Sequence, residues 1–103
     1  MRTLEDNRHY AYSAKVEPFK NKNKPLVLQF SVRHEQLIDC GGAYIKLFPA
    51  GLDQTKLGKD SEYSIMFGPD ICGAPTRLTR LVLNYKGRAL ALKRHVRLAP
   101  CMY

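Results

Sequence analysis

Most of the information in this chain lies in two tracts, HEQLIDCGGAYIKL (residues 34–47) and YSIMFGPDICG (residues 63–73). Each tract holds one cysteine, Cys40 in the first and Cys72 in the second. If these two cysteines pair, the tracts lie side by side and their polar aromatic and charged side chains gather in one place. The side chains concerned are Tyr44, Lys46, Tyr63 and Asp70.

Alternation of apolar and polar residues around these tracts predicts an all-β fold. In residues 26–33, Leu26, Leu28, Phe30 and Val32 fall in one phase, which is typical of a half-buried strand. Further strands are predicted at residues 10–16, where the pattern is weak, and at residues 43–48 and 63–67. Residues 51–61 read as a loop.

The last third of the chain predicts a β-hairpin. Residues 78–85 form one arm, Lys86-Gly87 the turn, and residues 88–98 the second arm. No stretch shows convincing helical periodicity. Several short strands separated by turns favour a sandwich or a barrel over a βαβ fold.

Length and charge narrow the class of protein. The 103 residues make one domain at most, and no apolar run approaches the roughly 20 residues that cross a bilayer. The net charge of +8 comes mostly from residues 76–103, which hold seven basic residues and no acid. Such a tail suggests an alternative function, a basic β module that binds nucleic acid or another acidic partner. No aromatic residues alternate with these basic residues. Their absence favours a strand face that is simply exposed to solvent over a nucleic-acid-binding surface.

Three cysteines leave two possibilities open. In an oxidising compartment we expect one disulfide and a remaining thiol, Cys101; in a reducing compartment all three stay reduced. Neither the cysteines nor the histidines have the spacing of a metal site, so no metal ligand is predicted. The histidines, His9, His34 and His95, have no plausible nucleophile partner. We therefore do not expect an enzyme.

The residue types in the two tracts suit a sugar-binding surface. Tyrosine rings pack on the apolar face of a pyranose, and charged groups form strong hydrogen bonds with its hydroxyls. Tyr44 and Lys46 are two residues apart on a predicted strand, so they project from the same face. Tyr63, Met66 and Asp70 belong to the second tract. Taken singly, each also fits a packed tyrosine or methionine, a solvated lysine or a turn aspartate.

The same tracts resemble the calreticulin and calnexin family of lectin chaperones. HEQ-I-DCGG-Y-KL (residues 34–47), SEY-IMFGPDICG (residues 61–73) and NYKG (residues 84–87) occur in the family's order and roughly its spacing. The resemblance extends from about Thr3 to about Arg97. It implies a legume-lectin-like, concanavalin A-like antiparallel β-sandwich of which this chain holds only a part, within residues 1–98, followed by a divergent tail at residues 99–103.

The resemblance also implies a function and a set of site residues. Family members bind the terminal glucose of monoglucosylated high-mannose N-glycans on unfolded glycoproteins and assist their folding. Cys40 and Cys72 match the family's disulfide beside the site. The residues that match family sugar contacts are Tyr44, Lys46, Tyr63, Met66 and Asp70.

Several family features are expected to fall outside this sequence. The calcium-site residues, the arm that recruits an oxidoreductase, and the retrieval signal have no counterpart here, and residues 1–10 lack the apolar core of a signal peptide. The resemblance implies the endoplasmic reticulum lumen for the parent protein. A truncated product without activity is the remaining alternative.

Overall fold

The computed structural model describes residues 1–92 and 96–97, and its regular structure is almost entirely β. This confirms the predicted all-β class. The strands are β1 (Cys40–Gly42), β2 (Ile45–Leu47), β3 (Ile65–Cys72), β4 (Thr76–Tyr85), β5 (Arg88–Ala91) and β6 (Val96–Arg97). One short 3-10 turn, η1 (Gln54–Lys56), lies within the predicted loop of residues 51–61.

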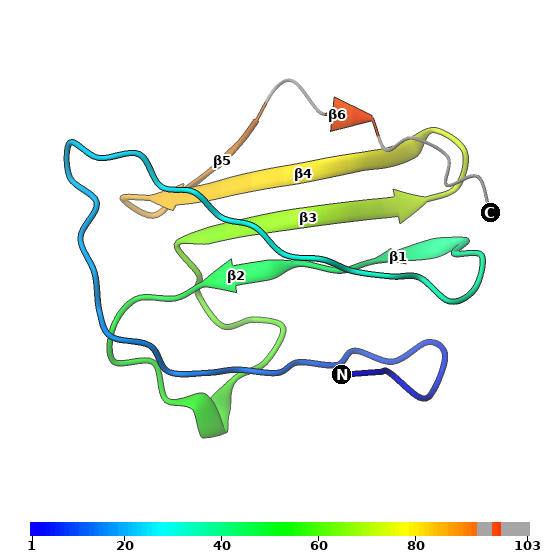
Figure 1. Cartoon of the computed structure of the whole chain (residues 1–103), viewed down its shortest axis with the longest axis horizontal. Helices are drawn as coiled ribbons and strands as arrows, with labels where there is room; N and C mark the ends of the chain where they lie inside the picture. Colours follow the sequence, from blue (N-terminus) through cyan, green and yellow to red (C-terminus); the bar gives the residue numbers. More distant parts are fainter. Residues whose placement is uncertain (93–95, 98–103) are drawn as a thin grey trace.

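All six strands belong to one antiparallel sheet with β3 and β4 at its centre (Figure 1). Strands β1 and β2 follow one another along the outer edge of β3. Strands β5 and β6 follow one another along the outer edge of β4. Within the described residues this is one layer of the sandwich that the sequence predicts.

The predicted hairpin around Lys86-Gly87 is confirmed. Lys86 and Gly87 both have positive φ, 49° and 72°, as a two-residue type I′ turn requires. Along the second arm, β5 and β6 both pair with β4, and the Leu92 amide donates to the Leu81 carbonyl at 3.0 Å; residues 93–95 lie outside the described residues. Leu98, the predicted end of that arm, lies outside the described residues.

The predicted strands at residues 10–16 and 26–33 are wrong. Neither stretch forms a strand, although Leu28 and Phe30 are half-buried as the alternation requires. The Phe30 ring meets the Phe67 ring edge-on at 6.0 Å between centroids, where the cyan segment crosses the sheet in Figure 1. Alternation of apolar and polar residues indicates only that one side of a segment is at least partly buried. Here Leu28 and Phe30 are half-buried because the segment lies across the sheet, without pairing with a strand.

The two-residue period of the strands divides the sheet into two faces. Lys46 is opposite Met66 in the register, whereas Ile45 is opposite Phe67, so neighbouring residues go to different sides. We call one side the site face; it carries Gly42, Tyr44, Lys46, Met66, Asp70 and Arg80. We call the other the apolar face; it carries Ile45, Leu47, Ile65, Phe67, Ile71 and Leu81.

Burial is shallow throughout the described residues. Val82, at 8% exposure, is the one hydrophobic side chain among them that is buried. Towards the β5 edge of the apolar face, Leu83 and Leu90 are 41% and 51% exposed. A sheet with so little covering is what a partial sandwich leads us to expect.

Candidate functional site

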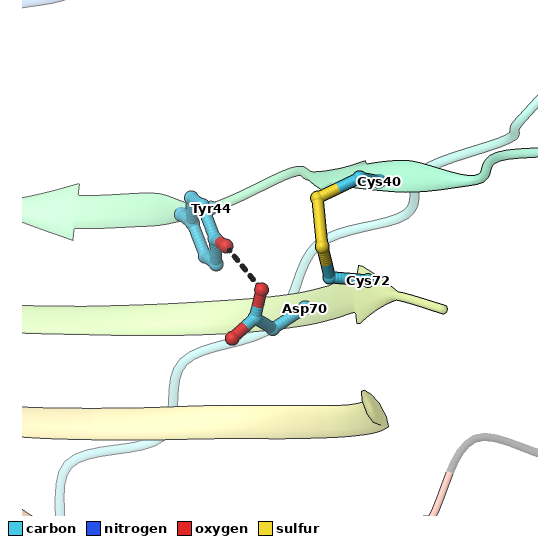
Figure 2. Close-up of a disulfide and its surroundings, with 4 residues drawn as sticks. All are labelled: Cys40, Tyr44, Asp70 and Cys72. Atoms are coloured by element: carbon cyan, nitrogen blue, oxygen red, sulfur yellow. Dashed lines mark hydrogen bonds between the residues drawn. A yellow bond between two sulfur atoms is a disulfide. The ribbon is translucent and has the colours of Figure 1, made fainter. Parts of the chain in front are cut away.

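The site is anchored by the predicted disulfide. Cys40 and Cys72 are directly opposite each other in the β1–β3 register and form a disulfide, with their Cα atoms 3.9 Å apart (Figure 2). One residue further out, the Gly73 amide donates to the Asp39 carbonyl at 2.8 Å. Together these contacts fix β1 against the end of β3, and they place Gly42 opposite Asp70.

Tyr44 and Asp70 meet directly on the site face. The Tyr44 hydroxyl donates to Asp70 Oδ1 at 3.0 Å, as Figure 2 shows. The tyrosine ring lies back over Gly42, where a Cβ would overlap the hydroxyl group. Gly42 therefore provides the space through which Tyr44 reaches Asp70.

The environment of Tyr44 keeps its hydroxyl protonated. Partial burial raises the pKa of Tyr44 to about 12, helped by the hydrogen bond to Asp70 and the negative charge of that carboxylate. The positive charge of Arg80 acts in the opposite direction and is the smallest influence. At any physiological pH the Tyr44 hydroxyl is consequently a donor.

Gly68 brings the link between β1 and β2 close to β3. A Cβ at Gly68 would overlap the backbone carbonyl oxygen of Ala43, and the residue has a φ of 155°. The Ala43 amide in turn donates to the Pro69 carbonyl at 3.2 Å. This close approach sets the backbone of Tyr44 beside Asp70.

Arg80 is a member of the site that the sequence analysis missed. Its Nε donates to Asp70 Oδ2 at 2.6 Å, and the two side chains are 38% and 19% exposed. Arg80 lies opposite Gly68 in the β3–β4 register. Because Gly68 has no side chain, the guanidinium can lean diagonally across to Asp70. The sequence analysis counted Arg80 only among the basic residues of the tail; strand alternation in a β3–β4 pairing could have found it.

Lys46, Tyr63 and Met66 form a second group on the same face. The Lys46 ammonium lies 4.9 Å from the centroid of the Tyr63 ring, a cation–π distance. Asn84 Nδ2 donates to the Tyr63 carbonyl at 2.7 Å, which fixes the backbone just before β3. Met66 is opposite Lys46 in the register.

The structure thus brings the five predicted sugar contacts together as two groups. Met66 and Asp70 are four residues apart on β3, about 13 Å along the strand, whereas Tyr44 and Lys46 are two residues apart, about 7 Å. A hollow of about 380 Å³ adjoins the second group at Tyr63; its other lining residues are Pro49, Glu62, Ser64, Asn84, Gly87 and Ala89. Tyr44, at 39% exposure, and Asp70, at 19%, do not line that hollow.

The chemistry of these groups suits recognition of a ligand. They offer hydroxyl and cationic donors, one carboxylate acceptor and aromatic rings. Among residues 1–92 and 96–97, no group of three or more His, Cys, Asp or Glu side chains could hold a metal ion. The calcium that the resemblance implies does not fit the residues present, and it enters no step below.

Two further observations bear on partners. In the described part of the chain, no helix has the length and apolar character to cross a membrane. The basic residues of β4 do not form one surface, since alternation sends Arg77 to the opposite side from Arg80, which is paired with Asp70. Lys93 and Arg94, on which the alternative of a polyanion-binding module depends, lie outside the described residues.

Comparisons with known proteins agree on one family. Residues 1–98 match the family described as the calreticulin family. Over 97 residues, or 94% of this chain, the sequence is 57% identical to the calreticulins of Oryctolagus cuniculus and Bos taurus, and 55% identical to that of Homo sapiens. The chain spans 23% of the length of each of these relatives.

Proposed function

Because this chain belongs to the calreticulin family, a family of lectin chaperones and not of enzymes, we propose that its site face binds the terminal glucose of monoglucosylated high-mannose N-glycans. The observation that carries the proposal is the Tyr44–Asp70 hydrogen bond at 3.0 Å beside the disulfide. It puts an aromatic ring beside a carboxylate, the two kinds of group that bind a pyranose.

Each residue has a role in this proposal. The rings of Tyr44 and Tyr63 pack on the apolar faces of the sugar, and Met66 lines the surface between them. Asp70 accepts from sugar hydroxyls, and the Lys46 ammonium donates to them. Binding is non-covalent and no bond in the glycan changes.

The wider role follows from the family and belongs to the same proposal. Glycan binding retains unfolded glycoproteins and assists their folding, and the setting is the lumen of the endoplasmic reticulum. An oxidising lumen suits the Cys40–Cys72 disulfide that holds the site. Calcium association and recruitment of an oxidoreductase would depend on parts of the family's proteins that this chain does not match.

Calorimetric titration of the oxidised chain tests the proposal. The ligand is a monoglucosylated mannose oligosaccharide, and the matched control ligand is the same oligosaccharide without its glucose. We expect heat only with the glucosylated ligand. Asp70→Asn should weaken binding at least tenfold, since a hydrogen bond to a charged group contributes about 1.5–3 kcal/mol.

A second variant separates the site from the overall charge. Glu17→Gln removes one acid from an exposed position of the N-terminal segment and should leave the affinity unchanged. Equal heat with both oligosaccharides would contradict the proposal, as would unchanged affinity in Asp70→Asn. No heat from a sample that carries the disulfide would mean that this chain has the family's residues without the activity.

A further inference from the structure

Both carboxylate oxygens of Asp70 accept hydrogen bonds, and the two donors come from different segments of the chain. Tyr44, which precedes β2, donates to Oδ1 at 3.0 Å, and Arg80 on β4 donates to Oδ2 at 2.6 Å. Asp70 on β3 lies between them and is 19% exposed. The three side chains form a chain of contacts from the link between β1 and β2, across β3, to β4.

An aspartate needs such support to act as an oriented acceptor. Rotation about its terminal sp³–sp² bond is broad, so a single contact leaves the plane of the carboxylate loosely defined. A guanidinium on one oxygen restricts that rotation and leaves the other oxygen directed at Tyr44. Arg80 uses its Nε for this contact; the guanidinium has further N–H donors.

We propose that Arg80 is a positioning residue of the glycan site: it holds Asp70 by Oδ2 so that Oδ1 stays aligned with the Tyr44 hydroxyl. The role of Arg80 in glycan binding rests on the proposed function. The alignment itself is a property of the free chain and can be tested without a ligand.

The first test measures the ionisation of Tyr44 in Arg80→Lys and Arg80→Met. The chain is labelled with ¹³C at tyrosine Cζ, and the Tyr44 signal is identified among the six tyrosines by its absence from Tyr44→Phe. The titration is followed by NMR to pH 12. Arg77→Met, which removes a charge from the opposite face of the same strand, is the matched control.

Positioning and simple charge predict opposite outcomes. If Arg80 acted only through its charge, both variants would raise the pKa of Tyr44, because methionine has no charge and a lysine, with a usual pKa of about 10.4, is neutral where Tyr44 titrates. If Arg80 positions Asp70, both variants weaken the hydrogen bond from Tyr44 to Asp70. That bond raises the pKa of Tyr44 by more than the charge of Asp70 or Arg80 changes it, so the pKa falls towards its usual value near 10. A rise in the pKa of Tyr44, or no change, in either variant overturns the proposal.

The second test measures affinity for the monoglucosylated oligosaccharide. We expect Arg80→Met to weaken binding about tenfold, Arg80→Lys by less, and Arg77→Met not at all. Affinity in Arg80→Met equal to or above that of the unmodified chain overturns the proposal. If the unmodified chain binds no glycan, the proposed function fails, and the Tyr44 titration alone decides the role of Arg80. If Arg80→Met does not fold, Arg80→Lys provides both tests.

Discussion

The two faces of the sheet are built from alternate residues of the same strands, yet they are held in different ways. On the site face, Asp70 is fixed by contacts from Tyr44 and Arg80, and the disulfide lies at the end of the same strand. On the apolar face, Phe67 meets one ring from the N-terminal segment, Phe30. Val82, the one buried hydrophobic side chain among the described residues, is opposite Met66 and so also lies on the site face. The faces therefore differ in these directional contacts and not in the depth of burial.

This contrast has a consequence for stability. The site depends on β1, β3 and β4, whose alignment is set by the disulfide and by backbone pairing. The apolar face depends on covering side chains that leave Leu83 and Leu90 about half exposed. A substitution on the apolar face should therefore lower the free energy of unfolding without changing the pKa of Tyr44 on the site face.

The largest effect is expected from removing the disulfide. The double variant Cys40→Ala/Cys72→Ala frees a loop spanning a sequence separation of 32, which costs about 3–4 kcal/mol in the chain-entropy model. It should also release β1 from β3 and lower the pKa of Tyr44. Urea unfolding followed by circular dichroism measures the free-energy change. Cys101→Ser keeps the disulfide and should unfold like the unmodified chain; equal stability in the double variant would contradict the account.

A smaller effect is expected from the apolar face. Phe67→Ala removes a half-buried ring and should lower the free energy of unfolding by about 2 kcal/mol, less than for a fully buried phenylalanine. Below the unfolding transition, the pKa of Tyr44 should stay raised, since the disulfide and Asp70 are untouched. Phe19→Ala, at a 58% exposed ring, is the control. A Tyr44 pKa near 10 in folded Phe67→Ala would show that the faces are not independent.

The smallest effect is expected from Tyr44→Phe, which deletes one exposed hydrogen bond to a carboxylate, worth about 1.5 kcal/mol. Because folding raises the pKa of Tyr44 to about 12, its contribution is complete below pH 10 and is lost as the pH rises towards 12. The stability difference between the unmodified chain and Tyr44→Phe should shrink over that interval. Tyr12→Phe, at a 77% exposed position, should show no such difference. A stability difference between the unmodified chain and Tyr44→Phe that grows with pH would contradict the raised pKa of Tyr44.

Sequence reasoning predicted what local patterns determine. The Lys86-Gly87 hairpin follows from turn chemistry. The resemblance to a known family marked the disulfide partners, and the structure confirms the pair. Strand β3 runs through Gly68 and Pro69 to Cys72, beyond the predicted end at residue 67. In the structure Gly68 is required by the close approach of Ala43, and Pro69 still accepts through its carbonyl.

What sequence reasoning missed depends on neighbours that are distant in the chain. Residues 26–33 alternate as a strand does, but they lie across the sheet instead of joining it. Arg80 is unremarkable among seven basic residues until the register places it opposite Gly68, within reach of Asp70. Neither feature can be read from residues close in sequence.

The most direct test of the central claim is to ask which face a glycan contacts. In a methyl-labelled, oxidised chain, the Met66 methyl reports on the site face, whereas those of Ile45, Ile71 and Leu81 report on the apolar face. Titration with the monoglucosylated oligosaccharide should shift the Met66 signal and leave the others in place. Shifts centred on Ile45, Ile71 and Leu81, or none at Met66 with the disulfide intact, would contradict the account.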